Sequence, residues 1–134
     1  DLIGRASGAE DARVEEIVGQ AIADAGFEVD ILHANHHGAD NASASAFLGI
    51  IQPEIAIISA GNGNSHKHPA NAALQRMADA GVYRIVQTSW GTTVGDISPI
   101  VRGHQAIFQN DIVIRTDGRK YELSTSRTFQ VDED

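Results

Sequence analysis

Apolar positions follow two patterns along the chain. One is the spacing of a helix face, and the other is the short continuous run that is typical of a buried strand. Between residues 14 and 25 an apolar side chain recurs every three or four positions, which predicts one face of a helix. Ser7 and Glu10 have the spacing of a capping box, and Gly26 suits a helix end. A helix is therefore predicted over about residues 9–25. Its apolar face comprises Val14, Ile17, Val18, Ala21, Ile22 and Ala25.

Three short apolar runs rich in β-branched residues predict buried strands. These runs cover residues 27–34, 54–60 and 83–87. Between them the pattern predicts a short helix that is capped by Ser43 and ends before Pro53. A second helix is predicted from Pro69, which suits a first helical turn, to Gly81. Strands that alternate with helices indicate an α/β layered architecture.

The C-terminal third has a different pattern. Asp117-Gly118 lies between two short apolar runs, 112–115 and 121–124, and predicts a β-hairpin. Residues 94–109 show neither pattern, so an extended loop or an insertion is expected there. The acidic residues 129–134 predict a frayed tail.

Composition limits the classes of function. The chain has 134 residues, enough for one domain or a large part of one, and 42% of them are apolar. Its net charge of −8 argues against a surface that grips phosphate backbones non-specifically, so nucleic acid is possible as a partner but not favoured. There are no cysteines, which excludes thiolate zinc sites and disulfides and leaves the compartment open. No apolar run approaches the roughly 20 residues that span a membrane, and no signal peptide pattern opens the chain.

Two polar loops that follow predicted strands carry histidines. His36-His37-Gly38 follows the first strand, and a neutral imidazole held at a strand end is a common metal ligand. Adjacent histidines on an extended chain face opposite ways, so we expect one at most to bind a given metal. The other would support it, contact substrate or pack. The alternative is a pair of polar loop histidines without a special role.

The second loop ends in Ser65-His66-Lys67-His68 before a predicted helix. Free N–H groups at a helix start favour an anion, and Lys67 or a protonated histidine would add positive charge. The loop could therefore hold a phosphate or carboxylate of a substrate. An ordinary helix start with solvated basic residues is the alternative.

Other polar residues give weaker signals. A terminal carboxylate such as Asp1 can bridge two cations if it ends a strand, although such residues are usually only solvated. His33 alternates with apolar strand positions and is expected to be packed or half-buried. His104 lies in the irregular segment near Arg102, and Asp96 is a loop carboxylate without a visible partner. The chain has no Gly-x-Ser-x-Gly elbow and no complete phosphate-loop or dinucleotide motif, so nucleophilic serine chemistry and those cofactor sites are poor fits.

Several of these segments, in this order, resemble the C-terminal half of metallo-β-lactamase-fold hydrolases. The nearest subgroup is the soluble domain of DNA-uptake competence (ComEC-type) proteins and its free-standing relatives. Four segments carry the resemblance. They are the strand and His-His-Gly motif at 29–40, the next strand at 53–61, the His-Lys-His-Pro segment at 66–69 and the closing hairpin at 116–121. The resemblance implies half of an αββα sandwich, in which 1–134 form the C-terminal part of one domain and 95–110 are an insertion.

The resemblance also implies a two-metal site, with zinc or possibly manganese, that activates water against a phosphoester or related ester. His36 would be the last ligand histidine, with His37 as the fallback, and Asp1 would bridge the metals. His68 would contact the substrate or stabilise the transition state. Substrate-binding roles fall to His37, Ser65, His66 and Lys67.

Two departures open an alternative reading. The family's principal metal motif, HxHxDH, is absent from these residues, and its usual serine after His-His-Gly is Ala39 here. Either the missing N-terminal half of the fold supplies the other ligands, or the chain is an inactive relative that binds anions or a partner. A half fold would leave a sheet edge and a sheet face uncovered, so we expect that the chain does not persist as a lone monomer.

Overall fold

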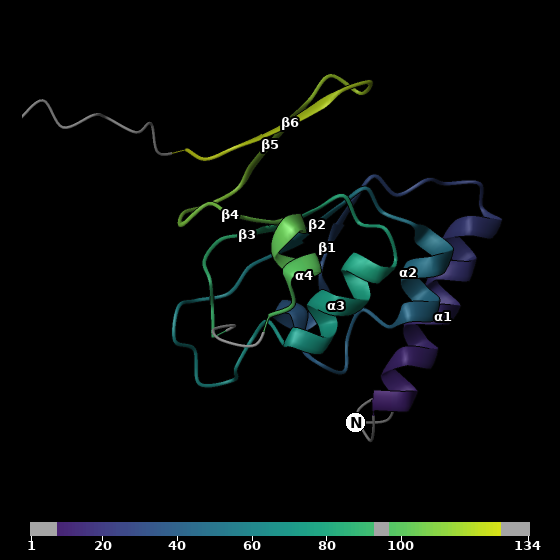
Figure 1. Ribbon diagram of the computed structural model, residues 1–134. Coiled ribbons are helices and arrows are strands. Elements are labelled where there is room, and N and C mark those ends of the chain that lie inside the picture. Colours follow the sequence, from purple (N-terminus) through teal and green to yellow (C-terminus); the bar gives the residue numbers. More distant parts are fainter. Residues whose placement is uncertain (1–7, 93–96, 127–134) are drawn as a thin grey trace, which may run out of the picture.

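The computed structural model describes residues 8–92 and 97–126, in which helices and strands alternate (Figure 1). The elements are α1 Gly8–Asp24, β1 Ile31–His33, a 3-10 turn Asn35–Gly38, α2 Ser45–Ile51, β2 Ile55–Ile58, α3 Asn71–Asp79, β3 Arg84–Gln87, α4 Pro99–His104, β4 Gln105–Ile107, β5 Val113–Thr116 and β6 Tyr121–Ser124. The predicted α/β class is confirmed. Among the described residues, no helix is both long and apolar enough to cross a membrane.

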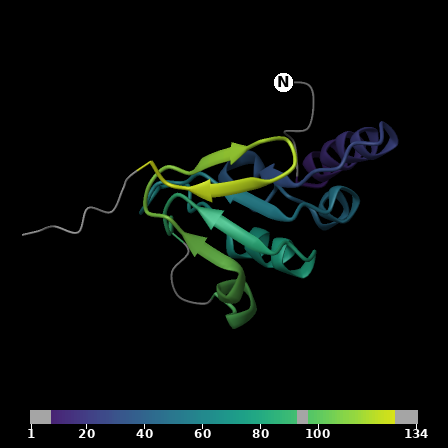
Figure 2. The same cartoon turned by 90° about the horizontal axis from the view of Figure 1, so that it is seen from above.

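Strands β1 to β4 form a parallel sheet in their order along the chain. Parallel neighbours joined through a helix connect with one hand, so successive crossovers in one direction place their helices on the same face. Helices α2, α3 and α4 accordingly lie on one side of the sheet (Figure 1). The antiparallel hairpin β5–β6 lies over the other side, as the view from above also shows (Figure 2).

The alternation of side chains along β2 builds two cores. All four residues of β2 are buried. Ala56 and Ile58 face the helices, where they pack with Leu74 and Met77 of α3. On the other side Ile55, Ile57 and Val86 form a second cluster, which apolar residues of β1, β4 and the hairpin cover. The expectation of an uncovered sheet face is therefore wrong for the centre of the sheet, because the hairpin folds over it.

Helix α1 is confirmed within one residue of its predicted bounds, but most of its predicted apolar face is not buried. Val14, Ile17 and Val18 are 40%, 59% and 49% exposed. Helix α1 packs on α2 rather than on the sheet. Close approach requires small side chains, and Gly19 provides one: a Cβ there would lie 3.0 Å from Phe47. The predicted Ser7 cap lies outside the described residues.

The sequence reading was wrong in two segments. The first strand spans only Ile31–His33, and Phe27 is 72% exposed. The predicted irregular segment 94–109 contains α4 and the fourth strand of the sheet within residues 97–109, and residues 94–96 lie outside the described residues. The start of α4 has an ordinary signal that the reading missed: the Ser98 hydroxyl accepts a hydrogen bond from Val101 N, and Pro99 opens the helix.

Two predicted helix starts are also corrected. Helix α3 begins at Asn71, so Pro69 precedes it instead of lying in its first turn. Helix α2 has Ala44 at its N-cap without a side-chain cap, and Ser43 has a left-handed backbone with φ 57°. The hairpin is confirmed at β5–β6. The tail 129–134 lies outside the described residues, and the αββα sandwich remains a prediction.

Candidate functional site

The loops that follow the four parallel strands meet at one edge of the sheet and line a hollow of roughly 610 Å3. This is within the range of small-molecule sites, about 300–1,000 Å3. In open α/β sheets, ligands bind at the carboxyl ends of strands, which is where this hollow lies. The lining residues are His37, Ser59, Ala60, Gly61, Asn62, Asn64, His66, His68, Thr88, Ser89, Gln109, Asn110 and Asp111.

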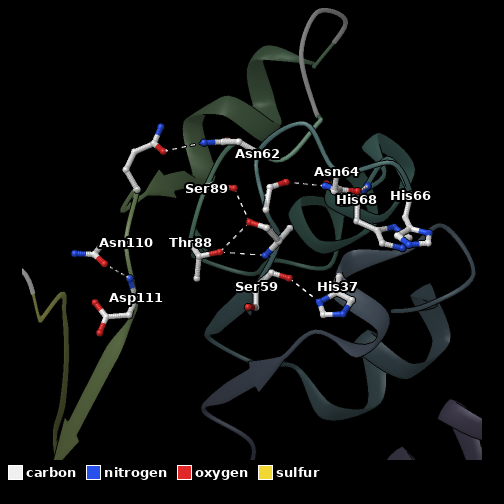
Figure 3. A pocket seen from close by; sticks show the side chains of 13 residues that line it. His37, Ser59, Asn62, Asn64, His66, His68, Thr88, Ser89, Asn110 and Asp111 are labelled. Atoms are coloured by element: carbon white, nitrogen blue, oxygen red, sulfur yellow. Dashed lines mark hydrogen bonds between the residues drawn. The ribbon is translucent and has the colours of Figure 1, made fainter.

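Imidazoles gather on one side of this hollow. Figure 3 shows the His37, His66 and His68 side chains on one side and Asn110 and Asp111 on the other. The ring centroid of His68 lies 5.2 Å from that of His36, 6.1 Å from that of His37 and 5.7 Å from that of His66. Four histidines from two loops thus converge. We call residues 35–44 the first histidine loop and residues 61–69 the second.

The first histidine loop turns sharply after β1. His36 and His37 have left-handed backbones, with φ 51° and 54°, and Gly38 follows with φ 74°. The two imidazoles line different spaces, since His37 lines the large hollow and His36 a smaller one of roughly 460 Å3 beside Lys67. The two imidazoles thus line different spaces although the backbone is left-handed and not extended, and the expectation that at most one of them binds a given metal stays a prediction.

The His37 ring has a defined tautomer. Its Nδ1 lies 2.7 Å from the Ser59 carbonyl oxygen. A carbonyl only accepts hydrogen bonds, so Nδ1 carries the proton and donates it. In neutral His37, Nε2 then has a free lone pair, the arrangement that metal-binding histidines commonly show.

The Asn64 side chain makes three hydrogen bonds to the backbone of the second histidine loop. Asn64 Oδ1 accepts a hydrogen bond from His68 N at 2.9 Å, and its Nδ2 donates to the carbonyl oxygens of His68 and Gly61 at 2.7 and 2.8 Å. Asn64 thereby holds the backbone on both sides of the His68 ring.

Two glycines let the loops approach each other. A Cβ on Gly38 would lie 2.8 Å from Pro69 Cβ, and a Cβ on Gly91 would lie 2.3 Å from the His68 carbonyl oxygen. Both glycines have positive φ, 74° and 65°. The Gly38 carbonyl oxygen also accepts a hydrogen bond from Ala70 N at 2.8 Å. Gly38 therefore joins the first loop to the second, and Gly91 supports the second from the loop after β3.

The electrostatics of the site differ between its two sides. Burial lowers the pKa of His68, and the neighbouring His36, His66 and His37 lower it further by charge repulsion. On the far side, hydrogen bonds from the Ser126 hydroxyl and backbone N–H lower the pKa of Asp111. Near neutral pH the hollow therefore has a neutral imidazole at His68 and a carboxylate at Asp111.

The structure brings four of the predicted site residues together, namely His36, His37, His66 and His68. Lys67 lines the smaller hollow and is exposed, and Ser65 lies with Lys67 beside the start of α3. Asp1 and Asp96 lie outside the described residues.

The two remaining histidines lie outside the site. His33 is exposed at the edge of the sheet, so the expectation that it is packed or half-buried is wrong. The His104 Nδ1 lies 3.1 Å from the Tyr83 carbonyl oxygen, and the residue lines neither histidine hollow.

Three residues that shape the site were not predicted from the sequence: Glu15, Asn64 and Arg76. Glu15 and Arg76 bond to the first histidine loop, and Asn64 bonds within the second. Asn64 stands in a turn-rich segment where its type suggests backbone capping. Glu15 and Arg76 lie on helices among other charged residues, with no local signal that separates them from solvated ones.

The described side chains do not form a complete metal site. Within residues 8–92 and 97–126, no three His, Cys, Asp or Glu side chains are grouped so that they could hold a metal ion. The converging imidazoles are therefore not a complete metal site by themselves. Any metal here needs ligands from residues that the structure does not describe or from another part of the protein.

Comparison with known proteins gives partial matches. Competence protein ComA of Neisseria gonorrhoeae is 36% identical over 52 residues, which are 39% of this chain and 8% of that protein. ComE operon protein 3 of Bacillus subtilis is 33% identical over 67 residues, which are 50% of this chain and 8% of that protein. Recombination protein 2 of Haemophilus influenzae is 28% identical over 71 residues, 53% of this chain and 8% of that protein.

No protein-family model and no solved structure matches the chain. Partial homology to ComEC-type competence proteins is shown. It spans about half of this chain and under a tenth of each relative. The homology supports the resemblance at the level of sequence and leaves the metallo-β-lactamase fold unconfirmed.

Proposed function

We propose that this chain supplies the histidine-bearing edge of a metal-dependent hydrolase site for phosphoesters, phosphodiesters or related esters. The observation that carries the proposal is the convergence of four imidazoles from two loops at the carboxyl edge of a parallel sheet, where three of them, His37, His66 and His68, line one hollow. The resemblance of those two loops to metallo-β-lactamase-fold hydrolases gives the reaction class. Zinc, or manganese, would supply a hydroxide near neutral pH.

The geometry favours particular roles for the histidines. His37 is the better ligand candidate of the adjacent pair, because its Nδ1–H is engaged by Ser59 and its Nε2 lone pair is free. His36 lines the smaller hollow with Lys67 and suits an anionic group of the substrate. A neutral His68 can accept a proton at one ring nitrogen or donate a hydrogen bond from the other.

Metal content of the purified protein is the first test, measured by elemental analysis on this chain and on the complete gene product. Two zinc or manganese ions on the complete product, with turnover of bis(p-nitrophenyl) phosphate, are expected. His37→Ala should remove metal and turnover. His33→Ala is the matched control, since His33 is exposed on β1 and lines neither histidine hollow. Full metal content and turnover in His37→Ala would refute the ligand role.

A second candidate function is an anion-binding or interaction module without catalysis. The observation that favours it is the lack of any three grouped metal-ligating side chains among the described residues. Isothermal titration with inorganic phosphate tests it. Phosphate binding that His36→Ala weakens, in a complete gene product that takes up no metal, would support the module and contradict the hydrolase.

A further inference from the structure

Two charged side chains of opposite sign hold the first histidine loop from outside the site. Glu15 lies on α1 and Arg76 on α3. Both make hydrogen bonds to residues 35–44 from positions 20 to 36 residues away in sequence. The hydrogen bonds of Glu15 and Arg76 go to groups of the loop other than the imidazole rings.

Glu15 binds the donors of the loop. Its carboxylate is buried, with the residue 8% exposed. Oε2 accepts hydrogen bonds from Ser43 N at 2.7 Å and Asn35 Nδ2 at 3.1 Å, and Oε1 accepts one from Ala44 N at 2.9 Å. Ala44 is the N-cap of α2, which has no side-chain cap of its own. Glu15 thus acts from another helix as the glutamate of a capping box does, and it also holds the residue just before His36.

Arg76 binds the acceptors of the same loop. Its guanidinium donates to the carbonyl oxygens of Ser43, Asp40 and Ala42 at 3.0, 2.6 and 2.8 Å. It also lies 3.6 Å from the Asp40 carboxylate, which is largely exposed. A guanidinium only donates and a carboxylate only accepts, so the two residues divide the backbone groups of the loop between them. Ser43 is bound by both, at its N–H and at its carbonyl.

This arrangement explains a conformation that the loop would not adopt alone. His36, His37 and Ser43 all have left-handed backbones, which cost free energy in residues other than glycine. Such conformations persist where surrounding contacts determine them. Charge-assisted hydrogen bonds to the Asn35 side chain and to the backbone of residues 40–44 provide such contacts on either side of His36 and His37.

We propose that Glu15 and Arg76 are positioning residues: they fix the first histidine loop in its left-handed conformation and so set the placement of His36 and His37 opposite His68. Their consequence for turnover rests on the proposed function, whereas their effect on the loop does not.

The test uses Glu15→Gln and Arg76→Lys in the full chain. A glutamine has the size of Glu15, but its side-chain NH2 group would face a backbone N–H of the loop. One of the hydrogen bonds that Glu15 accepts would then be lost. A lysine keeps the charge of Arg76 but cannot reach three carbonyls in a fork. Glu16→Gln is the matched control, because Glu16 is the next residue of α1 and is exposed. The readouts are histidine ring NMR signals and backbone amide exchange, with His33 and His104 as references in the same spectrum.

We expect both variants to shift or broaden the His36 and His37 signals and to speed amide exchange of residues 36–39 about tenfold or more. His33, His104 and the amides of β2 and β3 should match the wild type. Unchanged His36 and His37 signals, or faster exchange spread evenly over the chain, would overturn the proposal. If Glu15→Gln fails to fold, Arg76→Lys decides the matter through the bonds of Arg76 to the carbonyl oxygens of residues 40, 42 and 43.

The two proposals can fail separately. If the complete gene product has no hydrolase activity, the NMR and exchange results still test the positioning role. If it is active, Arg76→Lys should lower kcat, whereas the control variant Glu16→Gln should keep the wild-type rate. An active enzyme with normal loop signals in both variants would uphold the hydrolase and refute the positioning residues.

Discussion

The two histidine loops present the same kind of side chain to one site, but they are held in different ways. The second loop is held by its own residue Asn64, which bonds to the N–H and the carbonyl oxygen of His68 four positions away, and by backbone bonds to Gly91 and Thr92. The first loop is held by Glu15 and Arg76, whose bonds span 20 to 36 positions. The second loop is therefore specified in part by its own sequence, whereas the bonds from Glu15 and Arg76 make the first loop depend on the packing of α1 and α3. A substitution on either helix can disturb the site without touching it.

The largest expected effect tests how far the second loop depends on its surroundings. Gly91→Ala would place a Cβ 2.3 Å from the His68 carbonyl oxygen and 2.7 Å from Pro69 Cδ, at φ 65°. Backbone strain and overpacking together should lower the free energy of unfolding by roughly 2–5 kcal/mol. Urea denaturation measures the change.

Gly63→Ala is the matched control for Gly91→Ala. Gly63 has the same φ of 65°, but a Cβ there would meet nothing within 4 Å. Only the left-handed strain remains, so a loss of about 1–2 kcal/mol is expected. Equal losses in the two variants would show that contact with Gly91 does not support the second loop.

The next prediction tests whether Asn64 holds the second loop. Asn64→Ala removes three hydrogen bonds from a half-buried side chain and should cost roughly 1–3 kcal/mol of unfolding free energy. Asn62→Ala, at an exposed residue with one 3.5 Å side-chain bond, should stay within about 0.5 kcal/mol of the wild type. The His68 ring signal should move in the first variant only. If both variants behaved alike in denaturation and NMR, Asn64 would not be what holds the loop.

The contrast between the loops also explains which features the sequence predicted. Apolar periods and turn residues gave the α/β class, the course of α1 and the hairpin, because those signals are local. The His-His and His-Lys-His motifs marked both loops for the same reason. The left-handed turn at His36 and the contacts of Glu15 arise only when distant segments pack, and no local pattern encodes them.

The errors have physical causes of the same kind. Helix α1 packs on α2 through Gly19, so the periodic residues Val14 and Ile17 remain exposed although the helix is real. The six-residue α4 and the three-residue β4 are too short for a period to emerge, and Ser98-Pro99 was their sole start signal. Burial of a strand as short as β4 is decided by its neighbour β3 in the sheet.

The hairpin β5–β6 on the opposite face of the sheet is a reference region, and a smaller effect is expected there. Tyr121 of β6 donates a hydrogen bond to Glu54 at 2.8 Å, which ties the hairpin to the start of β2. Tyr121→Phe should cost roughly 0.5–1 kcal/mol at neutral pH, because Glu54 is exposed. The signals of both histidine loops should stay unchanged, and a shift in them would show that the hairpin also positions the site.

The same tyrosine predicts a pH dependence. Burial, followed by the hydrogen bond to Glu54, raises the pKa of Tyr121 from 10.0 to about 12. The folded state thus retains a proton that the unfolded state loses. The stabilisation is complete below pH 10 and is lost as the pH rises toward about 12. Denaturation midpoints of wild type and Tyr121→Phe should converge over that window, and a constant difference would contradict the assignment.

The smallest expected effect tests where the two loops meet. Burial is the largest cause of the lowered pKa of His68, and charge repulsion from His36 in the first loop is the next. In chelator-treated protein, an NMR titration of the His68 ring should give a pKa below 6.5. His36→Ala should raise that pKa without restoring the ordinary value, because the burial remains.

The folded state resists protonation, so the stability that neutral His68 contributes is present above pH 6.5 and is lost as the pH falls through the folded pKa. If His36→Ala left the titration of His68 unchanged, His36 would not be electrostatically coupled to His68, and the lowered pKa would come from burial, His66 and His37.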